Sequence, residues 1–368
     1  MKMPVFRGAK RWSLLVAGLF LSSISLAACG ENSPSILNTA GPVAASESGV
    51  FYAILVIATI VFVGVEGVLI YSIFKFRERP GMPAPKQLHG NLKVEIIWTV
   101  APALILFLVL GYTIRGLFEV ATQPADPNTV EVEAIGHQWW WEFHYPKYNF
   151  STADSLVVPT NTVIHVNLYS NNVIHSFWVP ELTGKTDLIP GHNNQIWFKA
   201  DIPNKTYLGI CAEFCGTQHA NMKFNVVVNT SDTFQTWLST QQQAAAKPTA
   251  GSLAAQGAQV FVNAGCTGCH GIVGENIKAS PNPRVACNDP TKACLVGPDL
   301  THFGSRNLIA GGVLENNVKE CQPGNLKNCN LAKWLRDPAA VKPGNDMAIG
   351  KLTDEQINQL VAYLESLK

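Results

Sequence analysis

Hydrophobic residues form long runs with few charged residues in the first third of the chain. One run lies behind a basic start, and two further runs cover residues 51–74 and 94–118. At 1.5 Å per residue, each of the two later runs is long enough to cross a hydrocarbon core about 30 Å thick. They predict a hairpin of two transmembrane helices rather than a buried helix pair of a soluble protein.

Residues 1–28 have the pattern of a secretory signal. Basic residues precede an apolar segment that ends in Leu26, Ala27, Ala28 and Cys29. This ending resembles a bacterial lipobox, which implies cleavage before Cys29 and a diacylglycerol on its thiol. An ordinary secretory signal with an unrelated cysteine is the alternative.

The segment between the two apolar runs is basic. It contains one acidic residue, Glu78, and five basic residues: Lys75, Arg77, Arg79, Lys86 and Lys93. The positive-inside rule therefore places this loop in the cytoplasm and both flanks of the hairpin, within residues 29–122, on the outer side of a bacterial inner membrane. That orientation agrees with a lipid-anchored Cys29 in the outer leaflet.

The pattern changes to alternation over residues 125–232. Val130 and Val132 alternate with Glu131 and Glu133, and further short β-branched runs follow between Pro, Gly and Asn turns. This pattern predicts an all-β sandwich or barrel.

Helical signals return after a linker at residues 233–251, which is rich in Gln and Ala and ends in Pro and Gly. The last region, 252–368, closes with an amphipathic segment at 352–367. Thr353 is its expected N-cap, with Gln356 three residues later.

Composition agrees with a multidomain membrane protein. The 368 residues are 47% hydrophobic and 14% charged, with a formal net charge of +1. Nucleic acid is excluded as a partner, because phosphate binding needs a concentrated basic patch and none is present outside the short basic loop.

One short stretch contains many potential metal ligands: Cys211, Glu213, Cys215, His219 and Met222. Thiolates, imidazole and thioether are soft ligands that suit copper, although the two cysteines alone also fit a disulfide or a zinc site. A mononuclear blue-copper loop uses a single cysteine, so a second one indicates two coppers that share both sulfurs.

The loop supplies too few ligands for two metals, so a further histidine must come from elsewhere in the β region. Spacing does not choose among the five that precede the loop: His137, His144, His165, His175 and His192.

A second cofactor motif follows. Cys266, Cys269 and His270 form the CxxCH pattern that attaches haem c covalently. Because methionine ligation raises the reduction potential and suits electron transfer, Met347 is favoured as the sixth ligand over His302. A zinc knuckle would need a second CxxC pair, which the sequence lacks.

Four further cysteines follow the haem motif: Cys287, Cys294, Cys321 and Cys329. An even number in an oxidising compartment predicts two disulfides. Of the three possible pairings we favour the local ones, Cys287 with Cys294 and Cys321 with Cys329.

Residues 172–180, Asn-Val-Ile-His-Ser-Phe-Trp-Val-Pro, together with the copper stretch resemble subunit II of the haem-copper cytochrome c oxidases. The resemblance implies a membrane hairpin followed by a cupredoxin barrel with a dinuclear CuA centre. It implies that the copper ligands are His175, Cys211, Cys215, His219, Met222 and the backbone carbonyl of Glu213. It also implies a magnesium site shared between the Glu213 side chain and subunit I.

Two other segments resemble the same family. The run Gly-His-Gln-Trp-Trp-Trp at 136–141 implies that Trp139 is where cytochrome c delivers its electron, whereas core packing explains the two tryptophans after it. Residues 94–99 resemble the start of the second family helix, which implies that Glu95 opens a proton channel into subunit I. A plain helix-end carboxylate is the alternative for Glu95.

The C-terminal region 252–368 resembles the class I cytochrome c module, an all-α domain fused to some bacterial oxidase subunits II. The matching segments are 297–302, 331–338 and 342–347, and one departure is Ala348, where the family usually has proline.

These features predict the electron-transfer subunit of a cytochrome c oxidase. Electrons are expected to enter the haem c from a periplasmic donor, either a cytochrome c or a quinol-oxidising complex. They then pass to CuA and on to the haem of subunit I, where O₂ is reduced and protons are pumped. Subunits I and III are the implied partners, and O₂ reduction is not expected on this chain.

Three other classes of protein are weighed against this prediction. A CuA-bearing nitrogen-oxide reductase subunit shares the copper motif and is the main alternative. A copper-delivery module would need neither Met222 nor a haem. A quinol oxidase subunit II would lack the ligands Cys211 and Cys215.

Overall fold

The computed structural model describes residues 34–83, 87, 89–170, 172–274 and 297–368. The expected signal and lipobox, with Cys29, lie outside the described residues. Cys287 and Cys294 also lie outside them, so the first predicted disulfide stays a prediction.

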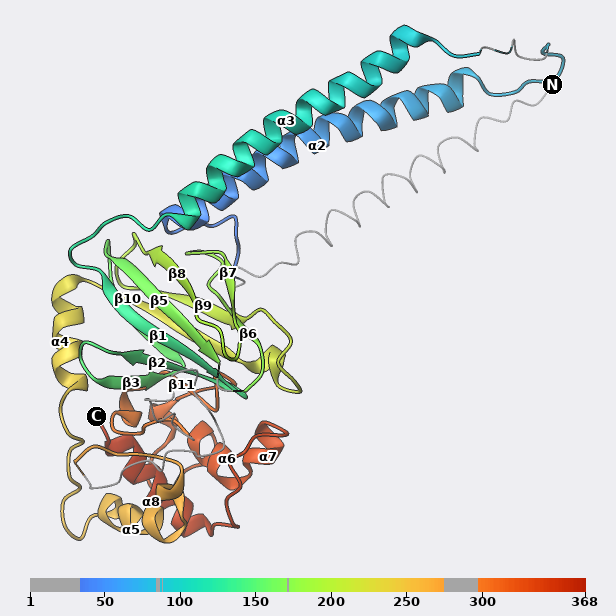
Figure 1. Ribbon diagram of the computed structural model, residues 1–368. Helices are drawn as coiled ribbons and strands as arrows, with labels where there is room; N and C mark the ends of the chain where they lie inside the picture. Colours follow the sequence, from blue (N-terminus) through green and yellow to red (C-terminus); the bar gives the residue numbers. More distant parts are fainter. Residues whose placement is uncertain (1–33, 84–86, 88, 171, 275–296) are drawn as a thin grey trace. The chain divides into compact units, whose positions relative to one another are not determined.

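Two helices in the described part of the chain are long and apolar enough to cross a membrane. They are α2, Pro42–Lys75, and α3, Leu92–Ala121, and they run antiparallel (Figure 1). Helix α2 begins before the apolar run predicted from Phe51. The reason is that its first turns, with Val43 and Ala44 buried, pack against the outer domain rather than lying in lipid.

The β domain contains, among the described residues, two five-stranded sheets with strand orders β3-β2-β1-β5-β8 and β4-β10-β9-β6-β7. The strands are β1 Val130–His137, β2 Trp140–Tyr145, β3 Phe150–Ala153, β4 Ser155–Pro159, β5 Val163–Ser170, β6 His175–Trp178, β7 Lys185–Leu188, β8 Asn194–Lys199, β9 Lys205–Cys211 and β10 Lys223–Asn229. The β1–β5 and β4–β10 pairs are parallel, whereas the other strand pairs in these two sheets are antiparallel.

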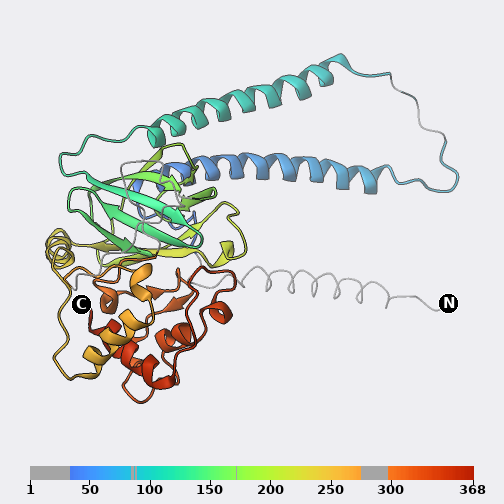
Figure 2. The same cartoon turned by 60° about the horizontal axis from the view of Figure 1, so that its bottom comes forward.

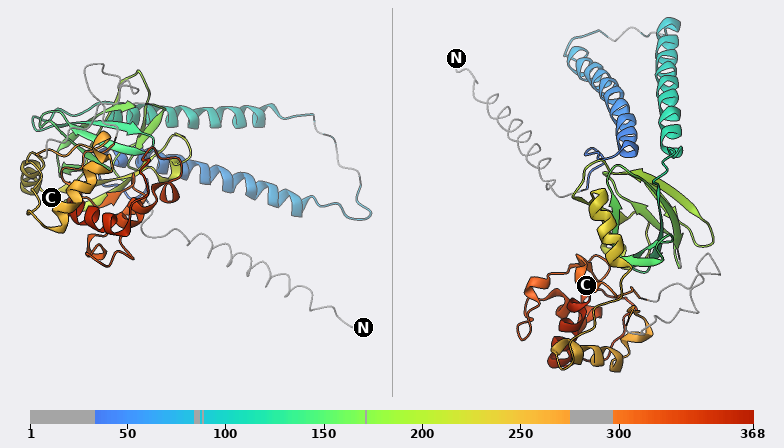
Figure 3. Two further views of the ribbon diagram at one scale, coloured as in Figure 1. Left: turned by 90° about the horizontal axis from the view of Figure 1, so that it is seen from below. Right: turned by 90° about the vertical axis from the view of Figure 1, so that its left-hand side faces the viewer.

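Alternation along these strands produces the core of the β domain. The burial of Val132 and Ala134 on β1 and of Val226 and Val228 on β10 follows the pleat, with apolar side chains between the sheets. Trp141 is fully buried there among Phe143, Phe177 and Phe224. Helix α4, Ser231–Gln241, packs on the outside of the domain and contacts β4 and β10 (Figure 3).

The C-terminal domain is mainly helical (Figure 2). Its described residues form the helices α5 Leu253–Asn263, α6 Asn330–Arg336, α7 Pro338–Val341 and α8 Asp354–Ser366. They also form three 3-10 helices, Cys266–Gly268, Phe303–Ser305 and Val318–Glu320, and the β11–β12 hairpin, Leu308–Ile309 with Leu314–Glu315. Helices α5 and α8 cross closely, because Gly257 has no side chain to overlap the Gln359 carbonyl. The predicted capping box of Thr353 and Gln356 at α8 is confirmed.

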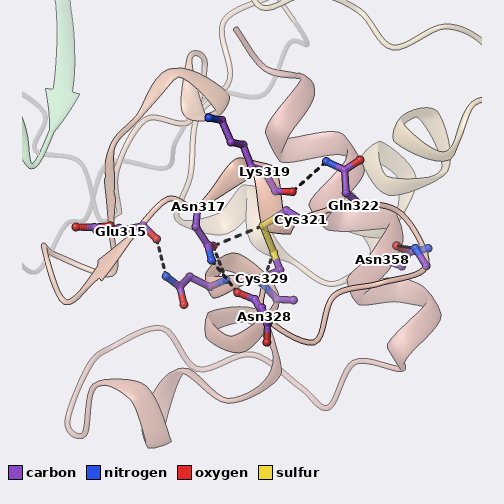
Figure 4. The surroundings of a disulfide bond; sticks show 11 residues. Glu315, Asn317, Lys319, Cys321, Gln322, Asn328, Cys329 and Asn358 are labelled. Atoms are coloured by element: carbon purple, nitrogen blue, oxygen red, sulfur yellow. Dashed lines mark hydrogen bonds between the residues drawn. A yellow bond between two sulfur atoms is a disulfide. The ribbon is translucent and has the colours of Figure 1, made fainter.

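The predicted disulfide between Cys321 and Cys329 is confirmed (Figure 4). It closes a loop with a sequence separation of 8 just before α6. The Cys329 sulfur also accepts a hydrogen bond from the Ala332 amide, and Asn317 Oδ1 accepts one from the Asn330 amide at 2.8 Å. The cross-link therefore holds the start of α6, a helix that is too short to be stable alone.

Candidate metal centre and haem site

The copper stretch folds as a loop between β9 and β10. Strand β9 ends at Cys211, a 3-10 turn covers His219–Asn221, and Met222 immediately precedes β10. Because β9 and β10 pair antiparallel, with Lys223 opposite Ile210, the two ends of the loop lie side by side. The loop therefore brings both cysteines and the methionine to one edge of the barrel.

The donor atoms form a connected cluster around the two sulfurs. The Sγ atoms of Cys211 and Cys215 are 3.7 Å apart, well beyond the length of a disulfide bond. Cys211 Sγ lies 3.9 Å from His175 Nδ1 and 3.2 Å from the Glu213 carbonyl oxygen.

The second sulfur has its own pair of neighbours. Cys215 Sγ lies 3.8 Å from His219 Nδ1 and 3.8 Å from Met222 Sδ. Each sulfur is therefore flanked by one imidazole nitrogen and one weaker donor, and this doubled set fits two soft cations better than one.

Strand β6 supplies the histidine that the sequence spacing left open. His175 is fully buried, and its Nε2 lies 3.1 Å from Asn172 Oδ1, which leaves Nδ1 directed at Cys211. In the described part of the chain, the ligand atoms of His175, Cys211 and Cys215 all lie within 4.8 Å of one another, close enough to hold a metal ion. Asn172 is a supporting residue that the sequence motif contained but whose role the sequence analysis missed.

The other four histidines have different surroundings. His137 is hydrogen-bonded to Glu142 and stacked on Trp140, and His144 is hydrogen-bonded to Ser151. His165 contacts Glu131, and His192 is exposed.

The two sulfurs shift the pKa of each other in opposite directions. Hydrogen bonding with Cys215 is the largest cause that lowers the pKa of Cys211, to about 3. The same interaction with Cys211, together with burial, raises the pKa of the Cys215 thiol well above its usual range. The lowered pKa favours the thiolate at Cys211, which is the form of cysteine that binds metal.

Trp139 lies against the same loop. Its indole Nε1 and the Gln138 Nε2 both donate to the Cys215 carbonyl oxygen, at 2.9 and 2.8 Å. Gly216, with φ +117, leaves room for the indole ring. Trp139 is 9% exposed, whereas Trp141 is part of the core with no exposed surface.

Asp154 is a buried carboxylate near this edge of the β domain. Its Oδ1 accepts a hydrogen bond from the Trp141 amide at 2.9 Å. Burial raises its pKa to about 6, while this hydrogen bond and the attraction of Lys342 oppose the shift.

The raised pKa predicts a pH-dependent stability. A folded-state pKa above the ordinary 3.8 gives stability that is present below that value and is lost as the pH rises through 6. We therefore compare the free energy of unfolding of Asp154→Asn with that of the wild type. The difference should shift in favour of the variant by on the order of 3 kcal/mol as the pH rises from about 4 to about 7. Thermal unfolding across this pH range measures it. Asp201→Asn, at an exposed position, is the matched control, and a pH-independent difference for Asp154→Asn contradicts the prediction.

The haem motif forms one tight turn after α5. The His270 amide donates to the Cys266 carbonyl at 3.0 Å, and both thiols of Cys266 and Cys269 are free. His270 Nδ1 donates to the Pro298 carbonyl at 2.7 Å, and burial lowers the pKa of the ring. A neutral imidazole with Nδ1 bonded leaves Nε2 available for iron, so these residues fit a covalently attached haem.

The two candidates for the sixth ligand differ in their surroundings. Met347 is half-buried against the C-terminal core, and its amide donates to Asn345 Oδ1 at 2.9 Å. His302 lines a cavity of about 850 Å³ together with Glu142 and His144, and neither His270 nor Met347 lines that cavity. The choice between them stays a prediction.

Glu95 lies at the start of α3. Its Oε1 accepts a hydrogen bond from the Asn91 amide at 3.2 Å, while Asn91 Oδ1 accepts from the Lys93 and Val94 amides. The carboxylate therefore caps the helix in this structure, and it is exposed.

Three family models match consecutive parts of the chain. Residues 35–115 match the transmembrane domain of cytochrome c oxidase subunit II, residues 149–230 match its periplasmic domain, and residues 254–368 match cytochrome c. Cytochrome c oxidase subunit 2 of Alkalihalophilus pseudofirmus is 35% identical over 355 residues, which is 95% of this chain and 95% of the relative. That of Bacillus sp. strain PS3 is 37% identical over 382 residues, with 98% and 99% covered. The chain belongs to the cytochrome c oxidase subunit 2 family.

A solved structure is similar as well. It is the periplasmic domain of subunit II of a Bradyrhizobium japonicum cytochrome oxidase, which is 31% identical, covers 33% of this chain and 97% of that chain, and has a TM-score of 0.31.

Membership in the cytochrome c oxidase subunit 2 family confirms the resemblance and the predicted fold class of hairpin, cupredoxin-like domain and cytochrome c domain. The chain is a subunit of a haem-copper oxidase that spans the membrane and has periplasmic domains. Family membership implies copper in the β domain and haem in the C-terminal domain.

Proposed function

We propose that this chain is the electron relay of its oxidase. It accepts electrons from a periplasmic donor on its c-type haem, passes them to a dinuclear CuA centre and delivers them to the haem of subunit I for O₂ reduction coupled to proton pumping. The observation that carries this proposal is the doubled donor set around two sulfurs 3.7 Å apart, in the same chain as a CxxCH turn.

The copper-binding residues divide into two sets. His175 and the Glu213 carbonyl lie beside Cys211, whereas His219 and Met222 lie beside Cys215. Two coppers held by these residues, and a haem c held by the CxxCH turn, would supply one-electron exchange. The chain supports this by placing His175 and Cys211 on the paired strands β6 and β9 and the other ligands in the loop between the paired strands β9 and β10.

The haem residues have separate tasks. Cys266 and Cys269 would hold the porphyrin covalently, and His270 and Met347 would hold its iron. The Pro298 carbonyl orients the His270 ring, and Asn345 holds the Met347 backbone.

Three further residues complete the proposal. Trp139 contacts the copper loop through the Cys215 carbonyl and is the proposed point of electron entry. The exposed Glu213 side chain is available to a magnesium ion shared with subunit I. Glu95 is the proposed entrance of a proton channel, in addition to its capping contact.

We infer that the chain is anchored at Cys29 in the bacterial inner membrane after removal of residues 1–28. The hairpin lies within 29–122, the cupredoxin domain spans 125–232, the linker 233–251 and the cytochrome c domain 252–368. Subunits I and III are the proposed partners in the membrane.

Metal and haem analysis of the purified full chain, with visible and near-infrared spectra, tests the proposal. We expect two coppers and one covalently bound haem per chain. One copper or none would reject the dinuclear centre. If the catalytic subunit that copurifies reduces nitrogen oxides rather than O₂, the nitrogen-oxide reductase alternative replaces the oxidase function.

A further inference from the structure

Two segments of the C-terminal domain contact the β domain around Trp139. One is the turn 310–312 between β11 and β12, and the other is 342–344, which precedes Met347. We call these two segments together the docking face. Lys342 Nζ donates to the Trp139 carbonyl and, at 2.8 Å, to the Ala310 carbonyl.

Two further hydrogen bonds extend the docking face to the copper loop and to the strand after it. Gln218 Nε2 donates to the Pro343 carbonyl at 2.9 Å, and the Lys223 amide donates to the Gly311 carbonyl at 3.4 Å. Gln218 is buried. These contacts involve residues on both sides of Met222.

Gly311 in this turn lies close to the Trp139 carbonyl. Gly311 has φ +68, and a Cβ there would overlap the Trp139 carbonyl and the Lys342 ammonium. Glycine at this position is therefore required by the contact as well as by the left-handed conformation.

Lys342 is 3% exposed, which is unusual for lysine. Burial lowers its pKa to about 8, whereas attraction to Asp154 raises it. Burying an ammonium is costly unless it is hydrogen-bonded and paired with an opposite charge. Two carbonyl acceptors and the buried Asp154 of the β domain provide that compensation.

A continuous run of hydrogen bonds joins the two proposed redox sites through Lys342. On one side, Trp139 Nε1 donates to the Cys215 carbonyl. On the other side, Asn345 Nδ2 donates to the Lys342 carbonyl at 2.6 Å, and Asn345 Oδ1 accepts from the Met347 amide. The position of Met347 is thus tied to the position of Trp139 by two side chains, those of Lys342 and Asn345.

We propose that Lys342 is a positioning residue that holds the docking face against Trp139 and thereby sets the rate of electron transfer between the haem and the copper centre. This inference rests on the proposed function for its redox part. The docking contact itself depends only on residues of this chain.

Hydrogen–deuterium exchange of the full chain in detergent tests the contact, with flash-induced electron transfer between haem and copper as the second measurement. We expect Lys342→Met and Gly311→Ala to accelerate exchange of the Lys223 amide about tenfold, the effect of losing one buried charged hydrogen bond. The transfer rate should fall by about tenfold or more, because small misplacements of reacting groups are costly. Lys342→Arg should restore part of both.

Matched controls separate docking from folding. Lys351→Met removes an exposed lysine near Met347, and Gly324→Ala introduces the same left-handed strain at φ +81 where a Cβ meets nothing. Both should behave as the wild type. Wild-type exchange at Lys223 in Lys342→Met and Gly311→Ala would overturn the inference. If copper or haem is missing from the wild type, the proposed function fails, while the exchange result still decides the docking contact.

Discussion

Cys211→Ser is expected to abolish the copper centre and with it electron transfer out of the haem. A serine hydroxyl is a hard donor that stays protonated and cannot bridge two soft cations, so copper content should fall from two per chain to one or none. Loss of a residue that only supports a metal ligand typically lowers activity about 10–100-fold. The rate of electron transfer should fall by more than this in Cys211→Ser. Copper analysis and the near-infrared spectrum measure the first effect, and flash-induced reduction measures the second.

Thr217→Ala is the matched control for this variant, since Thr217 is exposed in the same loop and contributes no soft donor. It should retain both coppers. Two coppers with an unchanged spectrum in Cys211→Ser would contradict the bridging role of this sulfur.

Met347→Ala is expected to leave the haem attached but to remove its sixth ligand. Cys266 and Cys269 still form the covalent links, so the mass of the chain with haem should be retained. Loss of the thioether should shift the iron toward high spin and lower its reduction potential by on the order of 0.1 V, within the about 0.8 V range that axial ligands span. Visible spectra and a redox titration measure both effects.

His302→Gln is the companion variant, because His302 is the other candidate ligand. It should leave the spectrum and the potential unchanged. The opposite pattern, with a high-spin iron in His302→Gln and none in Met347→Ala, would assign the sixth position to His302.

The order of structural classes along the chain could be predicted because each has its own hydrophobic period. Long apolar runs indicated the membrane helices, alternation indicated the β domain, and the Thr353–Gln356 pair indicated the start of α8. The start of α2 could not be predicted in the same way. Its first turns are buried by contact with the β domain, and the hydropathy of the sequence does not indicate this contact.

The copper site could be predicted in part. The four side-chain donors of the loop are local in sequence, so spacing was sufficient for them. The histidine was not, because five histidines fitted the composition equally well and only the resemblance selected His175. The fold brings His175 beside Cys211 through the pairing of β6 with β9, a contact between residues 36 positions apart.

The sequence by itself determined the kinds of cofactor and the order of the domains, because ligand motifs and hydrophobic periods depend on residues that are close together in the sequence. Only the tertiary structure decided which side chains support the ligands: Asn172 at His175, Pro298 at His270 and Lys342 at Trp139. The physical reason is that burial and hydrogen-bond partners depend on long-range packing. From the sequence alone, Lys342 is expected to be solvated, as most lysines are. In the fold it is buried, and carbonyl oxygens replace water as its hydrogen-bond partners.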